Sequence, residues 1–237
     1  MLASIGLVLF YTLLGFPAAI VCVPWTLLTG NISLMYRCGM GIARLGVRLF
    51  GLRPVVTGKE HVHPQQQYLF LSNHLSNLDP IMLLPEIPVR IAVFIKRPLM
   101  QIPILGYCMR LAGFIPVDRR GEVEAARASV RTALSVLQSG VSVASFVEGT
   151  RSPNGRLLPF KKGPFYLALE SKAPIIPVSI HGTEQMMRKG SLAIRRGRAH
   201  ITFHPPILPV NYPDRDSLMA AVRAAIASGL PDWMREQ

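Results

Sequence analysis

Charge is scarce in this sequence, and negative charge is the scarcer kind. Charged residues make up 16% of the 237 residues, where soluble domains have about a quarter, and the mean hydropathy is +0.33. Only 13 Asp and Glu oppose 26 Lys and Arg, which gives a formal net charge of +13. Such a chain suits membranes and anionic partners. Because few aromatic residues lie among the basic ones and no basic tail occurs, lipid and phosphate rank above nucleic acid.

Cysteine is also scarce. Cys22, Cys38 and Cys108 are odd in number and widely spaced, and no CxxC pair occurs. The pattern offers neither a disulfide framework nor a metal-ligand set, so we expect a reducing compartment, small buried thiols and no metal site. The sequence also lacks internal repeats and low-complexity linkers.

The first 36 residues contain no charge at all. Residues 1–28 are apolar and long enough to span a bilayer, and they lack the basic start and the cleavage site of a secretory signal. Pro17 and Pro24 argue against one straight spanning helix, because each removes a backbone hydrogen bond and bends the chain.

An amphipathic helix is predicted next, up to about Phe50. Asn31 and Ser33, after Gly30, mark a stop and a restart, and arginines then recur at helical spacing. We predict that residues 1–52 form a helical hairpin that dips into or lies along a membrane, with its arginines at the headgroups. A single transmembrane anchor is the alternative.

Residues 53–237 show short apolar runs that alternate with helical patterns. This alternation predicts an α/β domain in which helices flank a mixed, largely parallel sheet. The expected strands are at residues 55–57, 68–72, 91–95, 113–117, 143–147, 175–180 and 199–203. The expected helices are at residues 122–138, 164–171 and 217–228.

A histidine and an aspartate follow the strand expected at residues 68–72, in the motif SNHLSNLDP (residues 72–80). Four residues separate His74 from Asp79, an HX4D spacing. A carboxylate that keeps one imidazole nitrogen protonated leaves the other free to take a proton from a hydroxyl. On spacing alone, a plainer interpretation is a loop histidine beside an aspartate that caps a helix.

Three further motifs follow or form predicted strands, where α/β folds place ligands. They are GFIPVDRR (residues 113–120), FVEGTRS (residues 146–152) with FKKG (residues 160–163), and APIIPV (residues 173–178). Each of them alone is ambiguous, because an arginine pair after a strand or a Glu-Gly-Thr-Arg turn also occurs on ordinary surfaces.

Together, in this order and spacing, the four motifs resemble the glycerolipid acyltransferase family, specifically the bacterial 1-acyl-sn-glycerol-3-phosphate acyltransferases. The resemblance covers about residues 54–206. It departs at Val147, which stands where proline is the commoner residue in the family's FPEGTRS block; the departure affects the rigidity of the turn rather than the chemistry. Lys96 also matches a family lysine, although Arg97-Pro98-Leu99 replaces the Glu-Leu that often follows it.

The resemblance implies transfer of a fatty acyl group from acyl-CoA or acyl-acyl carrier protein to the sn-2 hydroxyl of lysophosphatidic acid, giving phosphatidic acid. His74 is then the general base and Asp79 fixes its tautomer. The acceptor hydroxyl attacks the thioester itself, so no enzyme nucleophile is required. A nucleophilic Ser76 stays open as an alternative.

The acceptor's phosphate calls for arginine forks and backbone amides. Arg119 and Arg151 follow strand ends and are the first candidates, with Lys96 next and Lys161 in reserve. The family resemblance also implies acceptor binding by the Glu148-Gly149-Thr150-Arg151 block. We expect oxyanion donors among the N–H groups near Gly149 or after His74, and an apolar groove for the acyl chain, lined from residues 91–113 and opening near the hairpin.

Other functions stay open at this point. The acceptor could be glycerol-3-phosphate, another lysophospholipid or a lyso-aminolipid, and water as acceptor would make the chain a thioesterase. A non-catalytic basic membrane-binding protein would explain the charge but not the ordered motifs. We expect the protein to be located at the inner (cytoplasmic) membrane, with its active site facing the cytoplasm. The expected partners are membrane lipids and the two substrates, with no cofactor and no nucleic acid.

Overall fold

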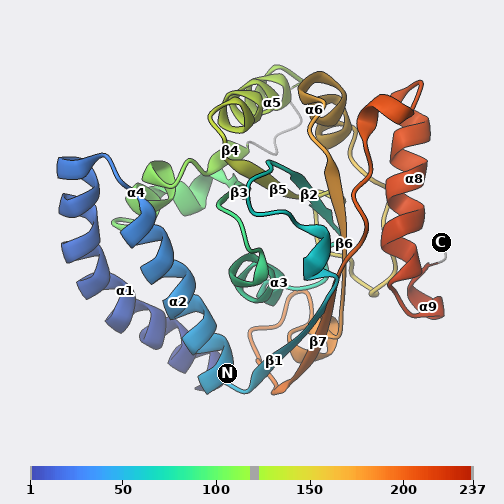
Figure 1. The fold of residues 1–237 in the computed structure, drawn as a ribbon. Coiled ribbons are helices and arrows are strands. Elements are labelled where there is room, and N and C mark those ends of the chain that lie inside the picture. The colour runs from blue at the N-terminus through green and yellow to red at the C-terminus, as the bar shows by residue number, and fades with distance from the viewer. Residues whose placement is uncertain (1, 118–122, 236–237) are drawn as a thin grey trace.

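A seven-stranded sheet forms the centre of the computed structural model, which describes residues 2–117 and 123–235 (Figure 1). In spatial order its strands are β1 (Leu52–Thr57), β7 (Gly197–Phe203), β6 (Ile175–His181), β2 (Leu69–Ser72), β5 (Ser142–Phe146), β3 (Ile91–Lys96) and β4 (Ile115–Val117). Neighbouring strands are parallel except β6 and β7. The predicted mixed, largely parallel sheet is therefore confirmed.

The three helices predicted in this part of the chain are also present. They are α5 (Val123–Gln138), α6 (Gly163–Ser171) and α8 (Arg215–Ser228). Helix α8 begins two residues earlier than predicted because Asp214 caps it, accepting a hydrogen bond of 2.8 Å from the Ser217 N–H.

Several short helices have no counterpart in the prediction, since one or two turns are too short to show a helical period. The α-helices among them are α3 (Leu78–Leu83), α4 (Leu105–Leu111), α7 (Thr183–Met186) and α9 (Asp232–Arg235). The 3-10 helices are η1 (Lys59–His61), η2 (Leu84–Glu86), η3 (Arg97–Gln101) and η4 (Pro209–Asn211).

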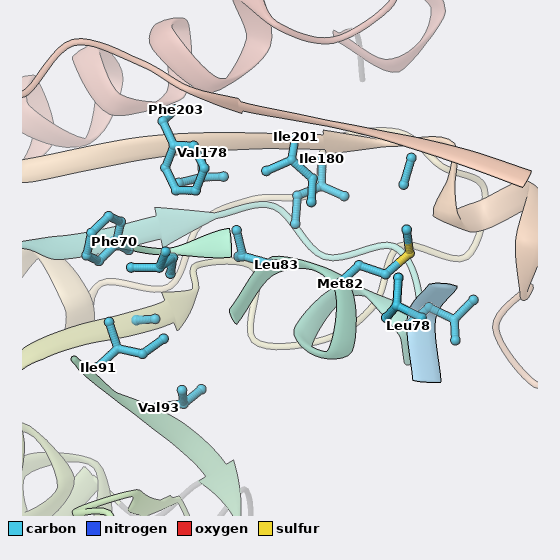
Figure 2. Close-up of a cluster of buried hydrophobic side chains, with 14 of the residues drawn as sticks. Phe70, Leu78, Met82, Leu83, Ile91, Val93, Val178, Ile180, Ile201 and Phe203 are labelled. Atoms are coloured by element: carbon cyan, nitrogen blue, oxygen red, sulfur yellow. The ribbon is translucent and has the colours of Figure 1, made fainter. Parts of the chain in front are cut away.

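Both faces of the sheet are covered, so its central strands are buried on both sides. Along β2, Leu69 and Leu71 pack with α5, α6 and α8, whereas Phe70 faces the opposite cluster. Figure 2 shows that opposite cluster, in which Leu78, Met82 and Leu83 of α3 lie among side chains of β2, β3, β6 and β7. This packing fixes α3, the helix that carries Asp79, against the sheet.

The N-terminal hairpin consists of α1 (Leu2–Thr29) and α2 (Ser33–Leu49), packed against each other. The predicted stop and restart is present: Gly30 has φ +67°, and the Asn31 side chain accepts a hydrogen bond of 2.8 Å from the Ser33 N–H. Pro17 and Pro24 do not divide α1, which continues through both of them as one helix that is curved in Figure 1.

Helix α1 is long and apolar enough to cross a membrane from Ala3 to Thr29, by length and composition. One side packs on α2, and the rest presents large exposed apolar side chains, namely Ile5, Val8, Leu9, Leu13, Leu14, Phe16, Ile20, Val21, Trp25, Leu27 and Leu28. Such a continuous apolar surface fits contact with lipid. Helix α2 contacts β1, α3 and η2 directly, and the division of the chain at residues 52 and 53 stays a prediction.

The three cysteines, which are far apart in sequence, meet where the hairpin touches α4. Cys22 is buried, and Cys38 and Cys108 are half-buried at the edge of the same small apolar cluster. Each is a free thiol that packs as a small apolar side chain.

Candidate active site

The predicted site residues follow the carboxyl ends of neighbouring parallel strands. His74 follows β2, Glu148 follows the adjacent β5, and Lys96 ends β3, the next strand along. Arg119 comes after β4 but lies outside the described residues. Since parallel strands end at one edge of the sheet, this edge collects His74, Glu148 and Lys96 from three separate segments of the sequence.

His74 and Asp79 are in direct contact. The His74 Nδ1 donates a hydrogen bond of 2.7 Å to Asp79 Oδ2, and the same oxygen accepts the N–H groups of Leu75 at 2.6 Å and Ser76 at 2.8 Å. The aspartate side chain is fully buried and that of His74 is 14% exposed. The carboxylate therefore holds the proton on Nδ1, and Nε2 makes no hydrogen bond to any residue that the structure describes.

The second oxygen of Asp79 is held by Thr183, the first residue of α7. The Thr183 hydroxyl donates a hydrogen bond of 2.5 Å to Asp79 Oδ1, and its side chain is buried. Nothing in the sequence marks Thr183 as a partner of the motif. The one available signal is its place directly after β6, which pairs with β2.

The His74 ring is fixed from its face as well as from its edge. It stacks on Phe146, the last residue of β5, with ring centroids 4.2 Å apart and planes 22° apart. The preceding Asn73 is buried and exchanges two hydrogen bonds of 2.8 Å with the backbone of Ile180 on β6. The asparagine thus ties the start of the motif to the sheet at the point where β2 has ended.

Glu148, which follows the adjacent strand β5, supports the same loop through a hydrogen bond to its backbone. Its side chain is buried, and Oε1 accepts the His74 backbone N–H at 3.2 Å, while Oε2 has no hydrogen-bond partner in the described part of the chain. Burial raises the pKa of Glu148 to about 8, against the lowering effect of the N–H groups of His74 and Leu158. At neutral pH this carboxyl group is therefore mostly protonated.

The Glu148-Gly149-Thr150-Arg151 turn lies against Lys161. Gly149 has φ +69°, and a Cβ at this position would stand 3.0 Å from Cγ of Lys161, so the turn requires glycine. The lysine is anchored by its N–H, which donates to the Val147 carbonyl at 2.7 Å. This contact brings the reserve candidate Lys161 beside the motif.

Three of the predicted phosphate-binding cations are free to bind an anion. The side chains of Lys96, Arg151 and Lys161 have no hydrogen bond or ion pair to other described residues. The Arg151 backbone carbonyl is itself bound, since it accepts a hydrogen bond of 2.8 Å from Lys189 Nζ.

The backbone donors near the site are mostly occupied. After His74, the N–H groups of His74, Leu75 and Ser76 serve Glu148 and Asp79, and the Gly149 N–H donates to the Phe146 carbonyl at 3.1 Å. The N–H groups of His74, Leu75 and Ser76 therefore do not supply the expected oxyanion donors. By contrast, the N–H groups of Thr150 and Arg151 have no partner within the described ranges.

Ser76 is not free to act as a nucleophile. Its side chain is fully buried, and its hydroxyl donates a hydrogen bond of 2.8 Å to the Met187 carbonyl. It also accepts the Leu78 N–H at 3.3 Å, at the start of α3. These contacts give Ser76 a structural role in the turn.

A pocket of about 400 Å³ lies between β4 and the segment that follows β3. Its lining is mainly apolar and consists of Arg97, Met100, Gln101, Arg110, Phe114 and Pro116. Most of these residues fall in the region expected to line the acyl groove. A second pocket, of about 450 Å³ between α2, β1 and α3, contains none of the predicted site residues in its described lining.

A metal site needs several ligating side chains grouped together. Among residues 2–117 and 123–235, no group of three or more His, Cys, Asp or Glu side chains is arranged to hold a metal ion.

A family model described as Acyltransferase matches residues 53–181 of the chain. The chain belongs to the acyltransferase family. The matched range contains His74, Asp79 and the Glu148–Arg151 turn, so the geometry above lies within the part of this acyltransferase that matches the family model. It ends at His181, two residues before Thr183.

Individual relatives of this acyltransferase carry one name. A plant protein from Limnanthes alba, 31% identical over 79% of this chain and 66% of its own length, is a 1-acyl-sn-glycerol-3-phosphate acyltransferase. So is a protein from Borreliella burgdorferi, 28% identical over 79% of this chain and 75% of its own. The chain spans less than two thirds of the plant and bovine relatives it matches (66% and 55%).

The fold matches a solved structure over nearly the whole chain. The crystal structure of the 1-acyl-sn-glycerophosphate (LPA) acyltransferase PlsC from Thermotoga maritima superposes with a TM-score of 0.79 at 25% identity. The match covers 95% of this acyltransferase and 94% of the PlsC chain, so it includes the N-terminal hairpin.

Proposed function

We propose that the chain is a 1-acylglycerol-3-phosphate O-acyltransferase. It moves a fatty acyl group from acyl-CoA or acyl-acyl carrier protein to the sn-2 hydroxyl of lysophosphatidic acid and releases phosphatidic acid. The observation that carries the proposal is the His74–Asp79 pair, in which Nδ1 is held at 2.7 Å and Nε2 is left open. The names of the relatives and of the matching PlsC structure support this choice of substrates.

In the proposed reaction the acceptor hydroxyl oxygen attacks the thioester carbonyl carbon while Nε2 of His74 takes its proton. The tetrahedral intermediate then expels the thiolate, which recovers that proton from Nε2, and the ester bond remains. Asp79 stabilises the imidazolium formed between the two steps without taking its proton. The buried hydroxyl of Ser76 has no part in this scheme, since it is already bound.

The acceptor's phosphate is assigned to the free cations at the same edge of the sheet. Arg151 offers a fork for a doubly charged phosphate, and Lys96 and Lys161 offer point charges. Arg119 is included on the basis of its motif. Their lack of ion-pair partners in the described ranges supports the assignment, because an unpaired basic cluster attracts a dianion without first breaking a salt bridge.

The developing oxyanion is assigned to the N–H groups of Thr150 and Arg151. These two N–H groups have no hydrogen-bond partner among the described residues, whereas the N–H of the preceding Gly149 is occupied. The Gly149 backbone, with φ +69°, sets their direction. Glu148 belongs to the proposed acceptor site because it is part of the turn that carries these donors. Its buried carboxyl group itself accepts the His74 backbone N–H.

The acyl chain is assigned to the mainly apolar pocket between Arg97 and Pro116. The apolar exposed face of α1 supports a membrane location for such an enzyme. We propose the inner membrane, with the site facing the cytoplasm, where acyl-CoA and acyl-acyl carrier protein are found.

The test is transfer of a labelled acyl group to lysophosphatidic acid by the purified chain and its His74→Ala variant. Transfer is expected to fall by about 10²–10⁴-fold in the variant, with vesicle binding unchanged. His63→Ala, at an exposed histidine, is the matched control and should keep full activity. Equal turnover in both variants would remove His74 from the mechanism.

The same assay separates the competing functions. Free fatty acid as the main product with and without lysophosphatidic acid would identify a thioesterase. Transfer to glycerol-3-phosphate, another lysophospholipid or a lyso-aminolipid in preference to lysophosphatidic acid would reassign the acceptor. Membrane binding with no acyl product from any acceptor would favour the non-catalytic protein.

A further inference from the structure

A short surface segment, which runs from η3 into the first turn of α4, exposes an unusual number of large apolar side chains. Within residues 98–107 the exposed fractions are 40% for Leu99, 42% for Ile102, 41% for Ile104, 46% for Leu105 and 39% for Tyr107. Single exposed apolar residues are normal on protein surfaces, but five of them within ten residues of the chain call for a partner.

The segment is rigidly mounted, so its exposure is a fixed feature of the surface. Met100 is buried, and its carbonyl accepts a hydrogen bond of 2.7 Å from Arg110 Nη1. Gly106 donates to the Ile102 carbonyl at 2.8 Å, and a Cβ on Gly106 would stand 2.1 Å from the Met100 carbonyl oxygen. The two ends of the segment are thus packed directly on each other.

Ile104 sits between these ends in a strained conformation. Its φ is +63°, a region that β-branched residues rarely adopt. Strain of this kind persists where the surrounding structure imposes it and tends to mark functional segments. Here its result is that an isoleucine side chain stands out from the surface.

The charges around the segment have one sign. No Asp or Glu occurs between Glu86 and Asp118 in the sequence. Lys96 and Arg97 precede the apolar residues and Arg110 follows them, all three exposed. An apolar centre with basic flanks fits the boundary between acyl chains and anionic headgroups, where apolar side chains insert and basic ones meet phosphate.

The segment adjoins the N-terminal hairpin. Cys108 and Leu111 of α4 pack against the cluster formed by Cys22, Ile32 and Met35 of the hairpin. Figure 1 shows α4 beside the ends of α1 and α2 that lie near their connection. The segment therefore lies beside the end of α1, the helix that carries the large exposed apolar surface.

We propose that residues 98–107 form a second membrane contact, which inserts its apolar side chains at the headgroup–acyl boundary of the bilayer that α1 binds. The proposal rests on membrane association of α1, and the bilayer is its one occupant. The pocket between Arg97 and Pro116 shares Met100 and Gln101 with this segment, so it opens at the bilayer surface. An amphiphilic substrate then reaches the pocket from the membrane without crossing water.

The direct test uses the full chain with Trp25→Phe and Trp233→Phe, carrying Ile102→Trp, in phosphatidylcholine–phosphatidylglycerol vesicles. With brominated acyl chains, the emission of this variant should fall to half or less of its value in unbrominated vesicles. Val210→Trp in the same background is the matched control. Like Ile102, Val210 is an exposed aliphatic residue. It lies in the 3-10 helix η4, and Figure 1 shows the neighbouring helices α6 and α8 far from the hairpin. Its emission should not change.

Absence of quenching in the Ile102→Trp variant, while vesicles still bind the chain, would overturn the proposal. If its emission instead shifted on dilution in detergent, a second copy of the chain would be the occupant, which overturns it as well. Neither measurement involves acyl transfer, so a failure here is distinct from a failure of the proposed enzymatic function.

A second measurement compares charge insertion at the two surfaces. Ile102→Glu with Leu105→Glu should weaken vesicle partitioning of the full chain by at least about ten-fold, since two apolar side chains lose their burial in lipid. Leu208→Glu with Val210→Glu adds the same charge at η4 and should change partitioning much less. If the two double variants weakened vesicle partitioning equally, the added negative charge alone would explain the effect, and the proposal would be overturned.

Discussion

The hydroxyl of Thr183 donates a hydrogen bond of 2.5 Å to Asp79, across 104 positions of sequence. With the three donors on Oδ2, this bond gives each carboxylate oxygen a partner, so Asp79 has no freedom to turn away from His74. Thr183 therefore acts on His74 through Asp79 and positions the base from α7, the helix that follows the neighbouring strand β6.

Replacing Thr183 with valine should slow the chemical step. Thr183→Val keeps the shape of the side chain but leaves Asp79 Oδ1 buried without its donor, a loss of about 1–3 kcal/mol. If that loss falls on the orientation of the dyad, kcat drops by about 5–100-fold while KM for lysophosphatidic acid stays nearly constant. Thr183→Ser restores the hydroxyl and should recover most of kcat. Steady-state kinetics of the three proteins check this, and a change in KM alone would contradict it.

Removing the charge of Asp79 should cost far more activity than stability. In Asp79→Asn the amide oxygen can occupy the Oδ2 position and keep all three donors, while the amide N–H group turns to Thr183, whose hydroxyl can accept. The geometry then survives and only the charge that stabilises the imidazolium is lost. We expect kcat to fall by about 10²-fold or more, with the melting temperature changed by a few degrees. A variant with kcat near wild type would show that the charge is not used.

The sequence predicted the local half of this site and missed the distant half. His74 lies in the loop after β2 and Asp79 in the first turn of the helix that follows, so their contact follows from spacing once the ordered motifs are recognised. Thr183, Phe146 and the backbone of Ile180 reach the same loop only because β5 and β6 flank β2 in the sheet. Strand order is a long-range property that no single motif encodes. The bracing contact of Glu148 was missed for the same reason, although the residue itself was named.

The fold shows a similar division. The central strands could be predicted because burial on both faces makes them continuous apolar runs, as in β2 and β6. The effect of Pro17 and Pro24 could not, since a proline in a helix can either end it or bend it, and neighbouring packing decides between the two. The meeting of the three cysteines in one cluster could not be predicted either, because it depends on the packing of α4 against the hairpin.

Glu148 should make the protein less stable as pH rises. Its pKa is about 8 in the folded chain against 4.5 for the free side chain. Between these values the unfolded chain releases the proton that the folded chain keeps. The free energy of unfolding therefore falls with rising pH through this window, by about 1.4 kcal/mol per pH unit from this group.

Glu148→Gln should remove that dependence, because its amide is neutral throughout and keeps an oxygen for the His74 N–H. The variant should gain stability relative to wild type as pH rises from 5 to 8, measured by denaturant unfolding in detergent. Glu170→Gln, at an exposed position on α6, is the matched control and should retain the wild-type slope. A constant difference between Glu148→Gln and wild type across this range would refute the assignment.

Arg151 should matter for the phosphate of the acceptor and little for the acyl donor. Its guanidinium has no ion-pair partner in the described ranges, so Arg151→Gln removes charge without stranding a buried carboxylate. We expect KM for lysophosphatidic acid to rise by about 10–100-fold, as for loss of a charge-assisted hydrogen bond of about 1.5–3 kcal/mol. Arg151→Lys should recover only part of this, because a lysine keeps the charge but not the fork.

Arg156→Gln, exposed on the following loop, is the control for loss of one positive charge. The decisive comparison is with monoacylglycerol as an acceptor that lacks phosphate: if Arg151→Gln weakened its use as strongly, the arginine would be orienting the turn and not binding the phosphate.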